Sequence, residues 1–424
     1  MKQPLLIFAI IAAVLGGGAL YFLKGGNFSN LLKLRHAVPS PIAACTPVKE
    51  DEARQVAQTV TDAFNALDGA PIDAVLDLET LFGEAIHQVQ LSDAERRNFM
   101  SGAVNGVRTT NNIPARWITA LGDKGRVRLL RIRQVDGHQR AQLRMLVGDG
   151  LNYLDLLIVR TPAGTIRVVD YQDMATGEFL SRSIASVAIP ALAGITRTSL
   201  ERLVQGSGND YLESVGKVPE LRKLMDEGKH QEAMERWRKL PENFRTTRAG
   251  ATMRMLIAQE LGEAEHLASL QEIERLFPND PALSLVQVDA NRLAKRYPQA
   301  QQAINRVDDI VGGDPYLDSL RASVFLEAGD LTAAQAAAAR ACEREPELID
   351  SWWTRVSISL TADTHALTGQ LLDEIKTRFG TEFQDDLAAV AEYARFGKSP
   401  EYPLWLARQS KPAAAAPQSE PPAK

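Results

Sequence analysis

The stretch Pro315–Pro346, PYLDSLRASVFLEAGDLTAAQAAAARACEREP, decides how the C-terminal half of this chain is interpreted. It consists of two segments with a helical pattern, separated by a single glycine, Gly329. Neither segment contains a recognisable catalytic or metal-binding motif. Helix pairs without chemistry of their own are typical of repeat units, which bury their apolar faces only by stacking on a neighbour. The stretch therefore predicts a helical hairpin within a larger array.

The pattern recurs along the C-terminal half. Units begin at Pro281, Pro315 and Ile349, a spacing of 34 residues that is the period of tetratricopeptide repeats. The middle unit has the family's residue types at positions 8, 11, 15, 20, 27 and 32, namely Ala322, Phe325, Gly329, Ala334, Ala341 and Pro346. Upstream, a further unit keeps the spacing of positions 15, 20, 24 and 27 with Gly228, Ala233, Trp237 and Leu240. Residues 211–407 therefore resemble a tetratricopeptide array of about five units.

The resemblance implies a protein-binding groove. In this family the first helix of each unit lines the groove, mainly through positions 2, 5, 9, 12 and 13. The partner-binding residues that follow for this chain are Asp289, Arg292, Tyr316, Ser319, Ser323, Asp350, Trp353 and Ser357. Because successive helical residues point about 100° apart, Trp352 is expected between the helices and Trp353 in the groove. The alternative is that a following helix, Thr381–Tyr393, covers Trp353 as part of the core.

The middle of the chain has a different period. Segments with a helical pattern run from Asp51 to about residue 107, and four segments with strand-like alternation follow them. The strands are joined at or near Asp136-Gly137, Asp149-Gly150 and Ala163-Gly164, which are residue pairs typical of hairpin turns. Helices followed by an antiparallel meander predict an α+β domain over residues 51–195.

This order of elements resembles the nuclear-transport-factor-two-like cone fold. The resemblance implies that a curved sheet wraps around a ligand pocket, a lyase or isomerase site, or merely a packing surface. Asp155 and Asp170, with Tyr153 and Tyr171 near them in sequence, are candidates for an acid/base site in such a pocket. The alternative is that these carboxylates belong to a polar outer face of the sheet.

The predicted sheet region and the repeat-like region differ in charge. Residues 114–175 carry ten basic and six acidic side chains, whereas residues 213–405 carry 23 basic and 32 acidic ones. The arginines of the sheet either form cross-strand pairs on a solvated face or attract the acidic repeats or another acidic partner. The net charge of the whole chain, −5, argues against general nucleic-acid binding.

The two ends of the chain have a different character. The run Leu5–Leu23 holds 19 residues without a charge, and as a helix it would span roughly 28 Å, close to the hydrocarbon thickness of a bilayer. We expect residues 1–24 to form a transmembrane anchor, residues 25–50 a linker and residues 408–424 a Pro/Ala-rich disordered tail. Lys2 and the α-amino group precede the run and Lys24, Lys33 and Arg35 follow it, so charge alone does not orient it.

These features predict an α+β cone-like domain followed by an all-α tetratricopeptide-like array, both held by an N-terminal transmembrane helix. We expect a non-enzymatic scaffold that binds protein partners and uses no cofactor, metal or nucleic acid. A short tail, an anchor and a large body resemble bacterial inner-membrane proteins whose bodies are periplasmic. The alternative function is small-molecule binding or lyase/isomerase activity in the cone. A third possibility is that the α+β domain caps the end of the array.

Overall fold

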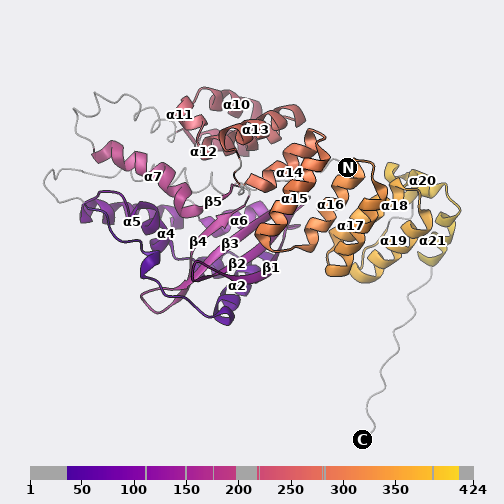
Figure 1. Cartoon of the computed structure of the whole chain (residues 1–424), viewed down its shortest axis with the longest axis horizontal. Helices are drawn as coiled ribbons and strands as arrows, with labels where there is room; N and C mark the ends of the chain where they lie inside the picture. Colours follow the sequence, from indigo (N-terminus) through magenta and orange to yellow (C-terminus); the bar gives the residue numbers. More distant parts are fainter. Residues whose placement is uncertain are drawn as a thin grey trace, which may run out of the picture. The chain divides into compact units, whose positions relative to one another are not determined.

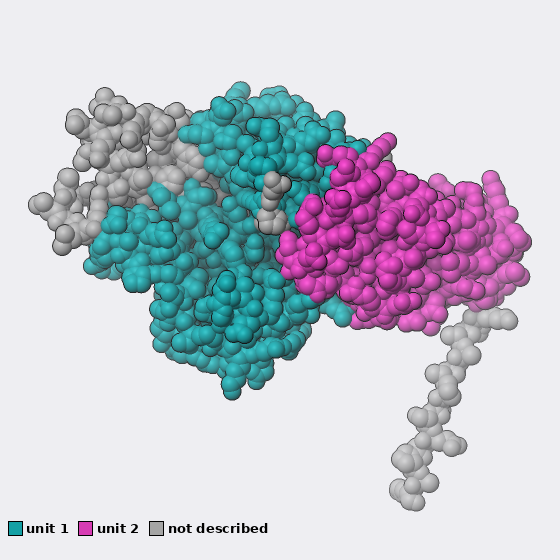
Figure 2. All heavy atoms as spheres, viewed as in Figure 1, with its two compact units in different colours: residues 1–294 teal, residues 295–424 magenta. Residues whose placement is uncertain are grey.

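The computed structural model describes residues 36–409, apart from 110–111, 149, 175, 197–216, 219, 279, 281–282 and 384–385. The chain divides into two compact units, residues 1–294 and residues 295–424 (Figure 2). As predicted, helices come first, an antiparallel sheet follows, and helices occupy the rest of the chain (Figure 1).

Short helices open the first unit. They are η1(Ile42–Ala44), α2(Glu50–Asn65), α3(Ala70–Val75), α4(Leu78–Ile86), α5(Asp93–Thr109) and α6(Ile113–Leu121). Their ends carry the residues that helix termini favour. Asp77 accepts a hydrogen bond from the N–H of Thr80, and Asn112 accepts one from the N–H of Ala115. The first turn of α2 is acidic, which complements the positive end of the helix dipole.

The sheet is an antiparallel meander whose strands lie in chain order. The strands are β1(Arg126–Val135), β2(His138–Val147), β3(Gly150–Arg160), β4(Ile166–Asp173) and β5(Glu178–Phe179). The first hairpin turns at Asp136 and Gly137, which both have positive φ angles, 51° and 80°. This is the conformation that makes an Asp-Gly pair a favoured hairpin turn. The four long strands match the predicted segments, whereas β5 was not predicted.

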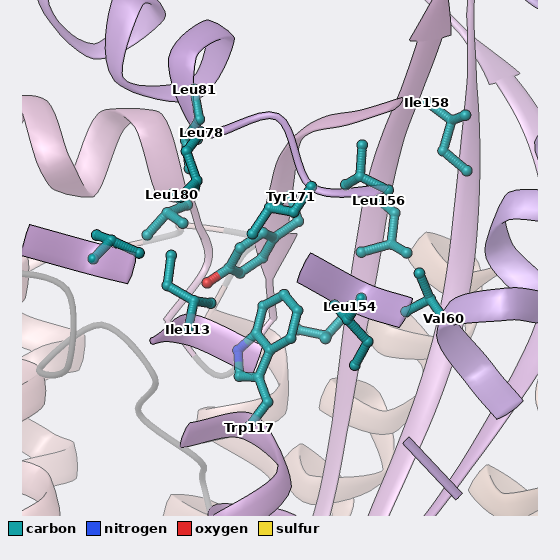
Figure 3. Packing of buried hydrophobic residues seen from close by; sticks show 14 of the residues in the cluster. Val60, Leu78, Leu81, Ile113, Trp117, Leu154, Leu156, Ile158, Tyr171 and Leu180 are labelled. Atoms are coloured by element: carbon teal, nitrogen blue, oxygen red, sulfur yellow. The ribbon is translucent and has the colours of Figure 1, made fainter. Parts of the chain in front are cut away.

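One face of the sheet and the helices enclose an apolar core. Leu154, Leu156 and Ile158 alternate along β3 and point to this face, where they meet side chains of the helices (Figure 3). The rings of Trp117, on α6, and Tyr171, on β4, pack edge to face with centroids 4.8 Å apart. Large apolar side chains therefore fill the space between this face of the sheet and the helices.

Part of the segment predicted as a linker lies against the α+β domain. Thr46 and Arg160 exchange backbone hydrogen bonds of 2.9 Å, and His36 pairs with Leu91 in the same manner. Between these points the hydroxyl of Ser40 donates a 2.5 Å hydrogen bond to Glu84. Residues 36–48 thus form a strap that is attached at both ends to elements of the α+β domain.

More helices complete the first unit. These are α7(Leu180–Thr196), α10(His230–Arg238), α11(Glu242–Arg245), α12(Arg248–Gln259), α13(Glu263–Leu276) and α14(Ser284–Leu293). Arg248 ties α12 to the end of the sheet. Its guanidinium donates a 2.8 Å hydrogen bond to the carbonyl of Thr176, lies 3.3 Å from Glu178, and covers the ring of Phe277 at 4.9 Å. Because Arg248 is largely buried, its pKa is lowered, with Glu178 opposing the effect.

The second unit is all helical. It contains α15(Tyr297–Val311), α16(Pro315–Glu327), α17(Leu331–Arg344), α18(Ile349–Thr361), α19(His365–Phe379), η3(Leu387–Ala389), η4(Ala391–Tyr393), α20(Ala394–Gly397) and α21(Glu401–Gln409). The opening stretch forms the predicted hairpin of α16 and α17. Gly329 has φ 81° at the turn, and Ala322, Ala334 and Ala341 are fully buried. These small side chains allow the two helices to approach closely.

The alternative prediction, a helix over Thr381–Tyr393 that covers Trp353, is wrong about the helix, although Phe383 of this range does pack on Trp353. The described residues of this range form an irregular segment followed by the short 3-10 turns η3 and η4. The next helix with two full turns is α21. Its Trp405 packs against Gly369 of α19 so closely that a β-carbon added to this glycine would lie 3.7 Å from the tryptophan. The helix that packs on α19 is therefore α21, which begins later in the sequence than the 34-residue period predicts.

Among the described residues, no helix is both long and apolar enough to cross a bilayer. The predicted anchor, Leu5–Leu23, and the predicted disordered tail lie outside those residues, apart from the first two positions of the tail range.

Candidate functional site

The predicted groove residues fall into both units. Asp289 and Arg292 belong to α14 in the first unit, and the other six belong to α16 and α18 in the second. The carboxylate of Asp289 already has a partner within the fold. It lies 3.1 Å from Nε2 of His266, and both side chains are buried. Arg292 is partly exposed. The contacts of Asp289 indicate a polar link between α13 and α14.

In the second unit the first helices of two hairpins lie side by side. The hydroxyls of Ser319, on α16, and Ser351, on α18, are 2.7 Å apart and buried. Ser319 therefore joins the two helices and does not present its hydroxyl to a partner. The four remaining small or polar residues of the predicted groove are partly exposed, namely Tyr316, Ser323, Asp350 and Ser357. Two adjacent first helices with exposed small side chains are the candidate binding surface of this unit.

The adjacent tryptophans of α18 have different surroundings. Trp352 is buried, its indole N–H donates a 2.9 Å hydrogen bond to the carbonyl of Pro346, and the guanidinium of Arg378 lies 4.9 Å above its ring. Trp353 is only partly buried, and its ring meets Phe383 edge to face with centroids 6.2 Å apart. Trp352 thus lies between helices as predicted, and Trp353 borders the segment that follows α19.

Sequence reasoning missed the aromatic residues that surround Trp353. Phe383 also packs edge to face on Trp405 of α21, with centroids 5.6 Å apart, so it lies between two tryptophans. Trp405 in turn contacts Phe396 and Tyr402. The concentration of aromatic residues after position 380 was the one available signal, because neither Phe383 nor Trp405 falls on a groove position of the repeat period.

The sheet carboxylates do not form one acid/base pair. Asp155 is buried and lies 3.0 Å from Arg133 and 3.3 Å from Arg140, so two arginines of neighbouring strands share its charge. Asp170 instead accepts hydrogen bonds from Ser181, at 2.6 Å from the hydroxyl and 3.2 Å from the N–H. Asp155 thus neutralises an arginine pair that lies directly opposite across β1 and β2.

Burial raises the pKa of Asp170 to about 6, and nearby Glu84 adds to this shift, whereas the hydrogen bonds from Ser181 and Tyr171 oppose it. Between pH 4 and 6 the folded protein retains a proton that the unfolded chain has released, so stability falls as pH rises through this window. Above it, the ionised carboxylate destabilises the fold by a constant amount. We expect the stability advantage of wild type over Asp170→Asn to shrink by about 1–3 kcal/mol between pH 4 and pH 7.

Urea denaturation of both proteins across this pH range measures the difference. Ser181→Ala is the matched control, because loss of its hydroxyl removes a group that stabilises the ionised form and should move the decline to higher pH. A difference between wild type and Asp170→Asn that stays constant from pH 4 to pH 7 would contradict the assignment.

The described part of the chain offers little else in the way of a metal site or a cavity. No group of three or more His, Cys, Asp or Glu residues there is arranged to hold a metal ion. A shallow pocket of about 260 Å³ is lined by Lys217, Glu220, Leu221, Arg236, Lys239 and Leu240. This pocket contains neither sheet carboxylate and none of the predicted groove residues.

Comparisons with protein-family models, with curated proteins and with solved structures gave no match. The site must therefore be interpreted from its own residues.

Proposed function

We propose that this protein is a non-enzymatic scaffold that binds protein partners through tetratricopeptide-like first helices. The observation that carries the proposal is the side-by-side arrangement of α16 and α18, joined by Ser319 and Ser351, with partly exposed Ser323, Ser357 and Trp353 on the same helices. A partly exposed tryptophan on helices that also expose small polar side chains suits the binding of a peptide, because aromatic rings dominate binding energy at protein interfaces.

The filled core of the α+β domain favours this proposal over the alternative of a ligand pocket. Phe64, Trp117 and Tyr171 are almost completely buried among leucine and isoleucine side chains (Figure 3). Burial raises the pKa of the Tyr171 phenol well above its ordinary value, and Asp173 and Asp170 add to this shift, whereas the Trp117 indole opposes it. A phenol in these surroundings is poorly suited to serve as a base. In the proposed function the cone-like domain is a packing element.

Site-specific photocrosslinking in native membranes tests the proposal. A photoreactive amino acid in place of Ser323 should give discrete crosslinked protein bands. The same amino acid in place of Ala336, an exposed residue of α17, is the control and should give none of those bands. Identical bands from both positions, or none from Ser323, would contradict the proposed groove.

The proposal places the body at a bacterial inner membrane, held by a single span at Leu5–Leu23 and facing the periplasm. Addition of protease to spheroplasts tests this orientation. Digestion of the α+β domain and the repeats is expected, and complete protection of the body would contradict the periplasmic location.

Deletion of residues 1–24 should release a soluble and folded protein, because no later segment of the sequence has a comparable apolar run. Separation of membrane and supernatant after a high-salt wash, followed by circular dichroism of the soluble fraction, measures the outcome. If the truncated protein still sediments with membranes at high salt, a second attachment must exist.

A further inference from the structure

Phe383 lies between two tryptophans that come from different helices. Its ring is edge to face with Trp353 of α18, at 6.2 Å and 75°, and with Trp405 of α21, at 5.6 Å and 74°. Edge-to-face pairs at these separations are favourable beyond the apolar area that they bury. We call the space between the rings of Trp353 and Trp405 the aromatic socket.

The backbone that carries Phe383 is held only weakly. Gly380 ends α19 in the left-handed conformation, with φ 65°, and the chain then leaves the helix. Within the described part of the chain, Thr381, Glu382 and Phe383 make no hydrogen bond, and Phe383 is held by its packing on the two tryptophans. The next attachments are the buried side chain of Leu387 and the 3.2 Å hydrogen bond from the N–H of Ala388 to the hydroxyl of Tyr402. Segments without backbone hydrogen bonds open at low free energy.

The position of the socket matters because Trp353 occupies the fifth position of its unit, where the repeat resemblance places a groove residue. The proposed groove position on α18 is therefore already covered by a phenylalanine from an irregular segment of the same chain.

We infer that Phe383 is an internal stand-in for a partner residue, and that the aromatic socket binds a phenylalanine side chain of an extended peptide. This inference rests on the proposed function and names the chemistry of the partner. The occupant is an aromatic side chain on non-helical backbone, because that is the chemistry of the residue seated between Trp353 and Trp405. A partner peptide must displace Phe383, so its apparent affinity is reduced by the fraction of molecules in which the socket is occupied.

A labelled peptide tests the inference on the full-length protein. The probe is a fluorescein-labelled peptide with the sequence of residues 380–388, GTEFQDDLA, and the comparison peptide has alanine in place of its phenylalanine. Fluorescence anisotropy measures the binding of both peptides to wild type and to Phe383→Ala. We expect Phe383→Ala to bind the probe at least tenfold more tightly than wild type, and to bind the comparison peptide at least tenfold more weakly than the probe.

Val390→Ala is the matched control. Val390 is exposed, follows the same irregular segment and makes no ring contact, so its loss should leave probe binding as in wild type. Phe383→Leu, which keeps most of the packed volume, should give an intermediate affinity and serves as the test variant if Phe383→Ala does not fold. Equal affinity of wild type and the Phe383 variants for the probe, binding that ignores the phenylalanine of the peptide, or no binding at all would overturn the inference.

The outcomes also separate the inference from the proposed function. Crosslinks from Ser323 combined with no peptide binding would leave the scaffold function standing and remove the stand-in role of Phe383. Peptide binding without crosslinks from Ser323 would support the socket and contradict the wider groove.

Discussion

Trp352→Ala is expected to lower the free energy of unfolding by about 3–5 kcal/mol, the usual cost of truncating a large buried aromatic side chain. The ring is 6% exposed, and it contributes to a core cluster with Leu371, Leu372 and Ile375 of α19. The substitution also removes the hydrogen bond to Pro346 and the cation–π contact with Arg378. Denaturant unfolding of the intact protein, followed by circular dichroism, measures the loss.

Trp353→Ala is the comparison, since the two residues are adjacent and identical in type. Trp353 is only partly buried, and its edge-to-face pair with Phe383 is worth about 0.5–1.5 kcal/mol beyond burial. We therefore expect a much smaller loss of stability than for Trp352→Ala, together with loss of partner capture. Equal destabilisation by both substitutions would show that Trp353 is simply a core residue and would contradict its place in the groove.

Asp318→Ala is also expected to destabilise the fold, by less than Trp352→Ala and for an electrostatic reason. The Asp318 side chain is 6% exposed, and it lies 2.7 Å from Arg344, 3.3 Å from Arg321 and 3.5 Å from Arg340. Loss of this carboxylate removes charged hydrogen bonds to Arg321 and Arg344 and should cost about 1–3 kcal/mol, because Arg321 keeps Asp308 as a partner and the half-exposed Arg340 and Arg344 remain hydrated. Here one carboxylate holds arginines of both α16 and α17, so their packing should weaken as well.

Arg340→Ala is the control for this prediction. Arg340 is about half exposed and is the most distant of the three arginines, so its ion pair contributes about 0–1 kcal/mol. Arg321→Ala should be more costly than Arg340→Ala, because Arg321 is 13% exposed and also lies 2.7 Å from Asp308. If Asp318→Ala and Arg340→Ala have the same small effect in denaturant unfolding, the cluster is not the link between α16 and α17 that its burial indicates.

The sheet could be predicted because its signal is local. Alternation with a period of two marks each strand, and the turn pairs are chemically specific: Asp136 and Gly137 adopt the positive φ angles that their types favour. The hairpin of α16 and α17 could also be predicted locally. Gly329 allows the positive φ angle of the turn, and the buried alanines allow the two helices to approach closely. Strand β5 has two residues, too few to show any period.

The site was harder to predict because its contacts are long-range. A repeat period assigns Asp289 to a groove position, but it does not reveal His266, which lies 23 residues earlier on another helix. Likewise, the period predicts a helix near Thr381, whereas the aromatic packing of Phe383, Phe396 and Trp405 is satisfied by an irregular segment and a later helix. Tertiary contacts override local helical preference here, because Phe383 and Phe396 pack on Trp405 of α21.

The strap formed by residues 36–48 sets the length of chain between the proposed span and the α+β domain. Because His36 is already paired with Leu91, only the twelve residues from 24 to 35 separate the proposed span from the first attached residue. Even a fully extended chain of that length reaches about 40 Å. If the proposed span anchors the chain, the α+β domain must lie within this distance of the membrane, and the proposed partners are then ones found at the membrane surface.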